Sequence, residues 1–143
     1  MIESPVARQL RTLRLIWMAF VASIFLYGLV LSIQPAQPVV DVGQMRSVFV
    51  PVALAEAAIG IWWRRRSTST TPAAKLDPQS FTQLQANCII VWALGSSIAI
   101  QGLILGFLSH DIGEFLPFAA AGLALLYVNR PNAWPQLANT GVV

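Results

Sequence analysis

The chain has 143 residues, of which 56% are hydrophobic and only 10% are charged. An ordinary soluble domain has about 25% charged residues, and a small domain needs polar groups to cover its large surface. The composition therefore disfavours a soluble enzyme, a disordered chain and a nucleic-acid-binding protein. The single Cys and the single His exclude an internal disulfide framework and the ordinary His/Cys metal clusters.

Four apolar runs are candidates for membrane-spanning helices, because a helix needs about 20 apolar residues to cross the bilayer core. They cover residues 15–33, 47–63, 87–108 and 113–128, and the last is the shortest. We expect a single integral membrane domain, residues 1–143, with an all-α fold: a four-transmembrane-helix bundle in which consecutive helices are antiparallel neighbours. The first run is longer than the apolar region of a signal peptide, so we expect it to be retained.

The basic residues predict the orientation of these spans. The loops between the predicted spans alternate between the two sides of the membrane. On one side, Arg46 is the only one of the nine Lys and Arg residues. The other side carries Arg8, Arg11, Arg14, Arg64, Arg65, Arg66, Lys75 and Arg130. The positive-inside rule places that side in the cytoplasm. We therefore expect a multi-pass protein of a bacterial-type inner membrane with both termini cytoplasmic (N-in/C-in) and a flexible cytoplasmic loop over residues 64–77. This topology explains the net charge of +3 without a nucleic-acid partner.

The five tryptophans lie at or near the predicted cytoplasmic ends of the spans. Amphipathic rings prefer the depth of the lipid headgroups, where the ring is buried and the N–H stays wet. Clustered arginines next to a span also attract anionic lipid. We expect these side chains to anchor the protein at the lipid interface: Trp17, Trp62, Trp63, Trp92, Arg64, Arg65 and Arg66.

Glu56 is the one ionisable residue deep in a predicted span. A central acid costs roughly 2.5 to 3.5 kcal/mol on insertion scales, so it has to be protonated, paired or beside water. Because no Lys or Arg lies within the spans, we predict a neutral carboxyl that donates a hydrogen bond. Ser96, Ser97 and Gln101 of the third run bracket its depth, and Ser97 and Gln101 share one helix face.

Two interpretations of this cluster stay open. Glu56, Ser96, Ser97 and Gln101 are candidates for a proton or cation site, since intramembrane acids are often functional. Alternatively, Glu56 is a buried acid that holds two helices together. The hydroxyls of Ser96 and Ser97 can equally bond back to their own helix, whereas an unsatisfied Gln101 amide in lipid is costly.

Small residues at four-residue spacing predict where helices pack closely, because they let two backbones approach each other. We expect most of this packing to be intramolecular and a remaining seam to serve a partner membrane protein or a second copy. The predicted packing positions are Ala53, Ala57, Gly60, Gly95, Ala99, Gly102, Gly106, Ala120 and Ala124.

The stretch 93–104, which reads ALGSSIAIQGLI, resembles the second helix of the rotor-ring proteolipid (c) subunits of ATP synthases, typically A-L-x-E-x-x-A-I-Y-G-L. The resemblance implies that the ion-carrying Glu of that family falls at Ser96, while residues 53–57 keep an acid, Glu56. The chain has no Gly-rich first helix, and its topology is opposite to that of the family's hairpins. We interpret the likeness as convergence on tight helix packing. As a whole, the chain resembles small four-span proteins of bacterial inner membranes.

The sequence contains no nucleotide-binding glycine loop, no metalloprotease helix and no nucleophile-elbow motif. We therefore expect no enzyme, no catalytic residue, no metal and no cofactor. The expected function is a non-catalytic accessory or scaffolding role in a membrane complex, with the bilayer and another membrane protein or a second copy as partners. The alternative is a small proton- or cation-conducting protein that uses Glu56 with Ser97 and Gln101.

Overall fold

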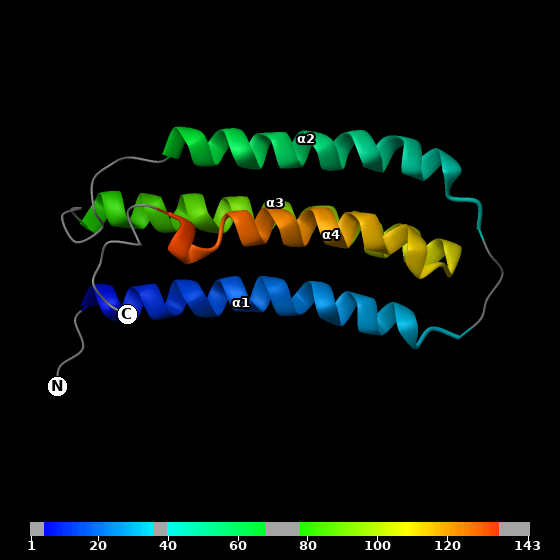
Figure 1. The fold of residues 1–143 in the computed structure, drawn as a ribbon, viewed down its shortest axis with the longest axis horizontal. Helices are drawn as coiled ribbons and strands as arrows, with labels where there is room; N and C mark the ends of the chain where they lie inside the picture. Colours follow the sequence, from blue (N-terminus) through cyan, green and yellow to red (C-terminus); the bar gives the residue numbers. More distant parts are fainter. Residues whose placement is uncertain (1–4, 36–39, 68–77, 135–143) are drawn as a thin grey trace.

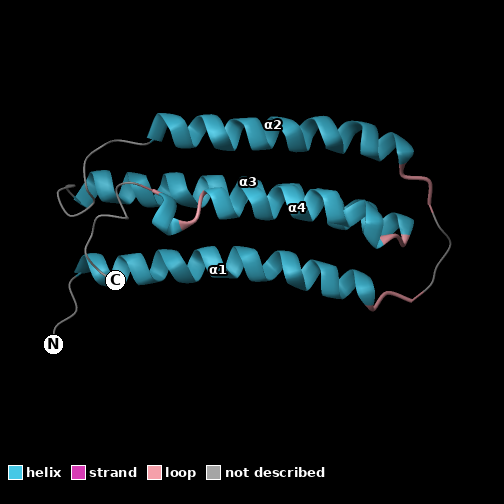
Figure 2. Ribbon diagram, in the orientation of Figure 1, coloured by secondary structure: helices cyan, strands magenta, loops and turns pink. Residues whose placement is uncertain are grey.

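The computed structural model describes residues 5–35, 40–67 and 78–134. Figure 2 shows these residues as helices joined by loops, and no strand occurs in the described ranges. The all-helical fold class is thereby confirmed for this part of the chain. The elements are α1 (Pro5–Ser32), α2 (Gly43–Ser67), α3 (Pro78–Ser109), α4 (Ile112–Val128) and the short 3-10 helix η2 (Pro131–Ala133).

The helices lie side by side, and each α-helix begins at the end of the molecule where the preceding one stops (Figure 1). α3 contacts the other three helices, and α4 packs along α3. α1 and α2 flank this central pair (Figure 1). The α3–α4 pair is therefore the core of the bundle, and the positions of α1 and α2 follow from their contacts with it.

Two glycines set the short distance between α3 and α4. A Cβ added at Gly102 would lie 2.5 Å from Cβ of Phe118, and one at Gly122 would lie 2.5 Å from the carbonyl oxygen of Gly95. Real Cβ atoms do not approach so closely, so the backbones pack at this distance only because both positions lack a side chain.

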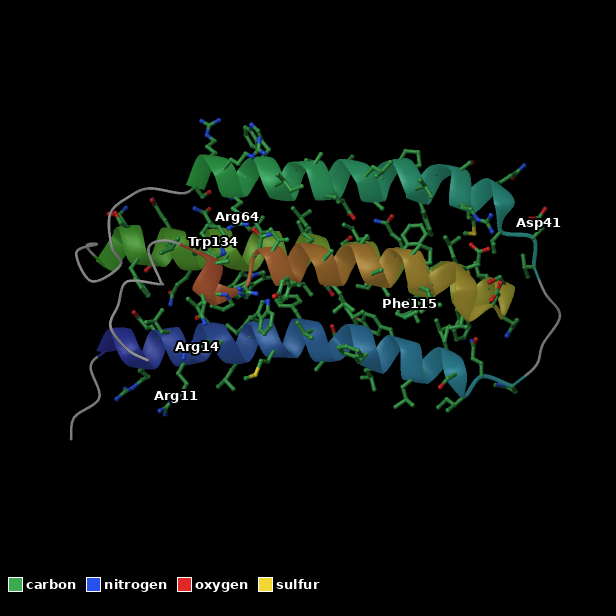
Figure 3. All side chains as sticks on the ribbon, in the orientation of Figure 1. Arg11, Arg14, Asp41, Arg64, Phe115 and Trp134 are labelled. Atoms are coloured by element: carbon green, nitrogen blue, oxygen red, sulfur yellow. The ribbon has the colours of Figure 1, made fainter. Side chains whose placement is uncertain are left out.

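Two charge-bearing ends can be distinguished in the bundle. Figure 3 shows Arg11, Arg14 and Arg64 at one end, which we call the basic end, and Asp41 at the other. The opposite end, which we call the turn end, also holds the two-residue connection from α3 to α4. In that connection His110 has a φ of 53°, and Asp111 caps α4 by accepting a 2.8 Å hydrogen bond from the Gly113 amide.

The helices extend beyond the predicted spans. α1 begins at Pro5 rather than near residue 15 because its first turns are amphipathic: Leu10 and Leu13 are buried, and the neighbouring arginines are exposed. The predicted loop at 64–77 was wrong at its start, since α2 continues to Ser67. Three arginines in the last turn complement the helix dipole there. Residues 68–77 lie outside the described residues.

The small residues that were predicted to pack on α2 and α3 are buried or half-buried. Gly60, Gly95, Ala99, Gly102 and Gly106 are buried, and Ala53 and Ala57 are half-buried. On α4, in contrast, Ala120 and Ala124 are exposed, so they do not pack against the other helices of this chain. The buried stripe of α4 runs through Gly122, and a residue two positions away lies about 200° around an α-helix.

Three helices in the described residues are long and apolar enough to cross a membrane: α1, α2 and α3. α4 is a shorter apolar helix of 17 residues, about 26 Å long at the rise of an α-helix. Because α4 is this short, other residues have to supply hydrogen-bond donors to its last carbonyl groups at the basic end.

Candidate functional site

Glu56 reaches from α2 to one face of α3. The Ser97 hydroxyl donates to Oε1 of Glu56 at 2.8 Å, and Nε2 of Gln101 donates to Oε2 at 2.7 Å. Both donors are uncharged and lie four residues apart, so they project from the same side of α3. The structure thus brings together three of the residues singled out from the sequence.

The cluster can hold the carboxyl group with or without a proton. In the ionised form both oxygens accept hydrogen bonds. In the neutral form the protonated Oε1 donates to the Ser97 oxygen, because a serine hydroxyl both donates and accepts. The same 2.8 Å contact thereby serves either state, and Gln101 continues to donate to the second oxygen.

Gln101 has one unused polar atom. Its side chain is only 8% exposed, and its Oε1 is buried without a hydrogen-bond partner in the structure. A buried acceptor of this kind costs free energy relative to the paired state. A rotation of the amide by 180° would turn this oxygen toward Glu56, which gives the cluster a second arrangement of its donors and acceptors.

Ser96 does not join the cluster. It is buried on α3, but no hydrogen bond to Glu56 forms, since consecutive residues of a helix point about 100° apart. The position matched to the ion-carrying Glu of the rotor-ring subunits therefore lies apart from the acid of this chain. Among the four candidate residues, the structure joins Glu56 with Ser97 and Gln101 only.

In addition to the bonds of Glu56, polar bonds near both ends of α2 attach this helix to the rest of the bundle. At the turn end, Arg46 forms a two-bond ion pair with Glu114 of α4, of which the Nε–Oε2 bond is 3.0 Å. At the basic end, Arg64 donates to the carbonyl oxygens of Val128 and Ala133 at 2.8 and 3.1 Å. These bonds give α2 polar attachments at three depths, and they require α2 and α4 to run in the same direction.

The tryptophans predicted to lie at the lipid interface differ in exposure, and the prediction needs correction for Trp92. Trp92 is completely buried and donates to the carbonyl of Asn129 at 2.7 Å. Trp17 and Trp63 are half-buried and donate to the Leu126 carbonyl and to the side chain of Asn87. Trp62 alone of these four is 52% exposed, with Arg66 stacked over its ring.

The reason for this correction lies at the end of α4. The last carbonyls of a helix have no intrahelical donor, and α4 ends among the other helices. Indole N–H groups of Trp17, Trp92 and Trp134 supply donors to its terminal carbonyls. Arg64 likewise donates to the Val128 carbonyl, so contact with lipid is not the only role of its guanidinium group.

Asn129 and Glu114 are the site residues that sequence reasoning missed. Asn129 is fully buried and receives two indole N–H groups on its carbonyl. The only sign of its role in the sequence was that a polar residue stands just before Arg130 and Pro131, where a helix is expected to end. Glu114 pairs with Arg46, and the isolated opposite charges of these two residues at one predicted end of the spans were the corresponding signal.

Within the described ranges, no group of three or more His, Cys, Asp and Glu side chains is placed to hold a metal ion. Comparisons with protein-family models, with curated proteins and with solved structures find nothing that matches this chain. The likeness to rotor-ring proteolipid subunits consequently stays a resemblance in sequence, and the function has to be argued from the geometry.

Proposed function

We propose that the protein is a four-span integral membrane protein with a non-catalytic accessory or scaffolding role in a membrane complex. One observation carries this proposal. In the described part of α2, only Gly60 is buried, and polar bonds at three depths hold the helix in place. Such a helix keeps a well-defined position while most of its apolar surface faces outward.

The outward surface of α2 supports a role in docking another membrane protein. Val48, Val52 and Ile59 are 58%, 42% and 49% exposed. In lipid, helices associate through packing and hydrogen bonds rather than through the hydrophobic effect. A rigidly held apolar face loses little conformational entropy when a partner helix packs on it, which favours binding.

The proposed topology follows from the charges. The basic end holds Arg11, Arg14 and Arg64 (Figure 3), and the positive-inside rule assigns such an end to the cytoplasm. In this proposal both termini are cytoplasmic, consecutive helices are antiparallel neighbours, and the membrane is the inner membrane of a bacterial-type cell. The arginines at this end favour anionic lipid.

Site-specific photo-crosslinking tests the accessory role. A photoreactive side chain is placed at Val52 or Ile59 on α2 and, as the control, at Phe25 on α1, which is exposed to an even larger fraction. We expect one discrete protein adduct from the α2 positions and none from Phe25. A monomer without any protein adduct from α2 would contradict the proposal.

One observation favours a second function, conduction of protons or cations. The Oε1 atom of Gln101 has no hydrogen-bond partner, and the same side chain already contacts Glu56. A rotation of the amide would bring this oxygen next to the carboxyl oxygens of Glu56. Oxygen ligands suit hard cations, and the Ser97 hydroxyl that contacts the carboxyl can either donate or accept a hydrogen bond, which suits a proton. Conduction would use Glu56 with Ser97 and Gln101.

Flux into liposomes separates the two functions. If the protein conducts, the near-isosteric change Glu56→Gln abolishes proton or sodium flux while the fold persists. If the carboxyl only joins α2 to α3, wild-type vesicles show no more flux than empty ones, and this second function is rejected.

A further inference from the structure

A groove between α2 and α4 lies apart from the Glu56 cluster. Its volume is about 460 Å³. Its floor is formed by the buried Ile98 and Phe118 and by the half-buried Ala53 and Ala57, while Leu54 is 67% exposed at its rim. The groove therefore opens sideways, toward the surface that faces lipid in the proposed membrane location.

The dimensions of the groove select its occupant. It extends along α2 from Arg46 to Ala57, about 16 Å at the rise of an α-helix, which is one leaflet of a hydrocarbon core about 30 Å thick. Spread over that length, its volume gives a cross-section of about 30 Å², whereas an α-helix about 10 Å wide needs roughly 80 Å². A single hydrocarbon chain fits inside this space, whereas a helix would have to lie over its open side.

The mouth of the groove carries charges of both signs. Arg46 and Glu114 line it at the turn end, and their ion pair uses Nε and Nη2 of the arginine, so its other terminal nitrogen lies outside the pair. Arg46 is 52% exposed and Glu114 17% exposed. A guanidinium binds phosphate oxygens well, and a carboxylate binds an ammonium group.

Gly113 adds an acceptor to this mouth. It lines the groove, and the residue four positions later is Pro117, which has no N–H. The Gly113 carbonyl consequently cannot accept the usual helical hydrogen bond from that position. Its oxygen and the Glu114 carboxylate together offer acceptors for an ammonium group that carries N–H donors.

We propose that this groove binds one phosphatidylethanolamine molecule of the leaflet at the turn end. One acyl chain fills the apolar groove, the phosphate contacts Arg46, and the primary ammonium contacts Glu114 and the Gly113 carbonyl. An unfilled apolar groove would forfeit dispersion contacts along its walls, and the chain restores them. This inference rests on the proposed membrane location but is independent of the accessory role and of conduction.

Native mass spectrometry of the full chain in detergent tests the proposal with three probe lipids of identical acyl chains: phosphatidylethanolamine, phosphatidylcholine and phosphatidylglycerol. We expect one phosphatidylethanolamine per chain and clearly lower occupancy by phosphatidylcholine, whose quaternary ammonium has no N–H donor. Equal occupancy by all three lipids overturns the proposed headgroup recognition.

Two neighbouring alanines provide the matched pair of variants. Ala121 lines the groove, Ala120 does not, and both are exposed on α4, so neither change disturbs the core. Ala121→Phe fills the groove and should weaken phosphatidylethanolamine binding about tenfold or more, because the added ring and the acyl chain cannot share one space. Ala120→Phe should leave binding unchanged. Equal binding by the two variants overturns the assignment of the groove.

A change at the mouth tests the headgroup separately. Glu114→Gln removes the negative charge and leaves Arg46, so preference should shift from phosphatidylethanolamine to phosphatidylglycerol. An unchanged preference contradicts the proposed contacts. A dimer that forms without lipid and is lost in Ala121→Phe assigns the groove to a second copy and overturns the lipid. Protein that leaves membranes without detergent refutes the membrane location itself, whereas detergent-bound protein that retains no phosphatidylethanolamine refutes only the groove.

Discussion

At the scale of single residues, a few polar side chains of the described ranges have hydrogen-bond partners on another helix of the bundle. Glu56, Ser97 and Gln101 join α2 to α3. Trp92 and Trp134 share the carbonyl of Asn129. An unpaired polar group is more costly in lipid than beside water, so these few bonds determine how the helices are placed relative to one another.

We expect Glu56→Leu to destabilise the protein by about 1 to 3 kcal/mol, because Ser97 and the buried Gln101 lose their acceptor. Glu56→Gln should be nearly neutral, since Gln101 can rotate its amide and use the Oε1 that has no partner in the structure. Thermal unfolding in detergent measures both. Ala55→Leu, at an exposed position of the same helix, is the control for added bulk. Equal losses for the Leu and Gln variants at Glu56 would argue against this role.

The indole of Trp92 gives a second prediction at this scale. Trp92→Phe keeps most of the ring but removes the donor to the Asn129 carbonyl, which retains only the 3.2 Å bond from Trp134. We expect a loss of about 1 kcal/mol in the free energy of unfolding. Trp62→Phe, at a 52% exposed position, should change it by less than about 0.5 kcal/mol. The comparison fails if the two variants unfold alike.

At the scale of the elements, the four α-helices differ in how they are held. α3 and α4 are joined by close backbone packing at Gly95, Gly102 and Gly122. α2 buries only Gly60 among its described residues and relies on polar attachments. α1 packs through a stripe that includes Leu13 and Ile24. Close packing makes the central pair intolerant of added atoms, while the flanking helices tolerate them at most positions.

We expect Gly122→Ala to destabilise the α3–α4 pair by about 1 to 3 kcal/mol, because the new Cβ would lie 2.5 Å from the Gly95 carbonyl and the backbone has to move. Gly28→Ala is the matched change on α1, where the new Cβ meets a ring atom of Phe115 at 3.3 Å, so this side chain has to shift by only a few tenths of an ångström. Higher helix propensity, about 1 kcal/mol, should make that change neutral or slightly stabilising. Thermal unfolding in detergent distinguishes the two, and a tolerated Gly122→Ala would contradict the packing argument.

At the scale of the whole molecule, the distribution of charge is the basis of the proposed orientation in a membrane. The basic end and the turn end are opposite each other (Figure 3). The short α4 begins at the turn end with Asp111 as its cap and Glu114 in its first turn, where negative charges favour the helix N-terminus. The same arrangement separates the proposed lipid groove at the turn end from the indole cluster at the basic end.

Labelling of cysteines in intact cells tests the proposed topology. Val40 is 52% exposed at the turn end, and Gln9 is exposed near the start of α1. A membrane-impermeant maleimide should label Val40→Cys and should label Gln9→Cys only after the membrane is permeabilised. The native Cys88 is completely buried and gives little background. The reverse labelling pattern would invert the topology.

The hydropathy of the sequence was sufficient to predict helices, because apolar runs of this length bury their backbone polar groups only as helices in lipid. The pairing of Glu56 with the Ser97–Gln101 face could also be predicted from the sequence, since depth can be counted from the tryptophans at a fixed rise per residue. Depth alone could not exclude Ser96, whose separation from Glu56 depends on the rotation of α3 about its axis.

The sequence by itself thus determined the helical class, the depth of the one central acid and the grouping of the arginines. Only the tertiary structure decided which way each helix is turned. That rotation exposes Ala120 and Ala124, buries Trp92 against Asn129, and brings Arg46 to Glu114. The physical reason is that hydropathy varies little around helices that are apolar on every side, so their orientation is set by a few close contacts and hydrogen bonds between residues far apart in the chain.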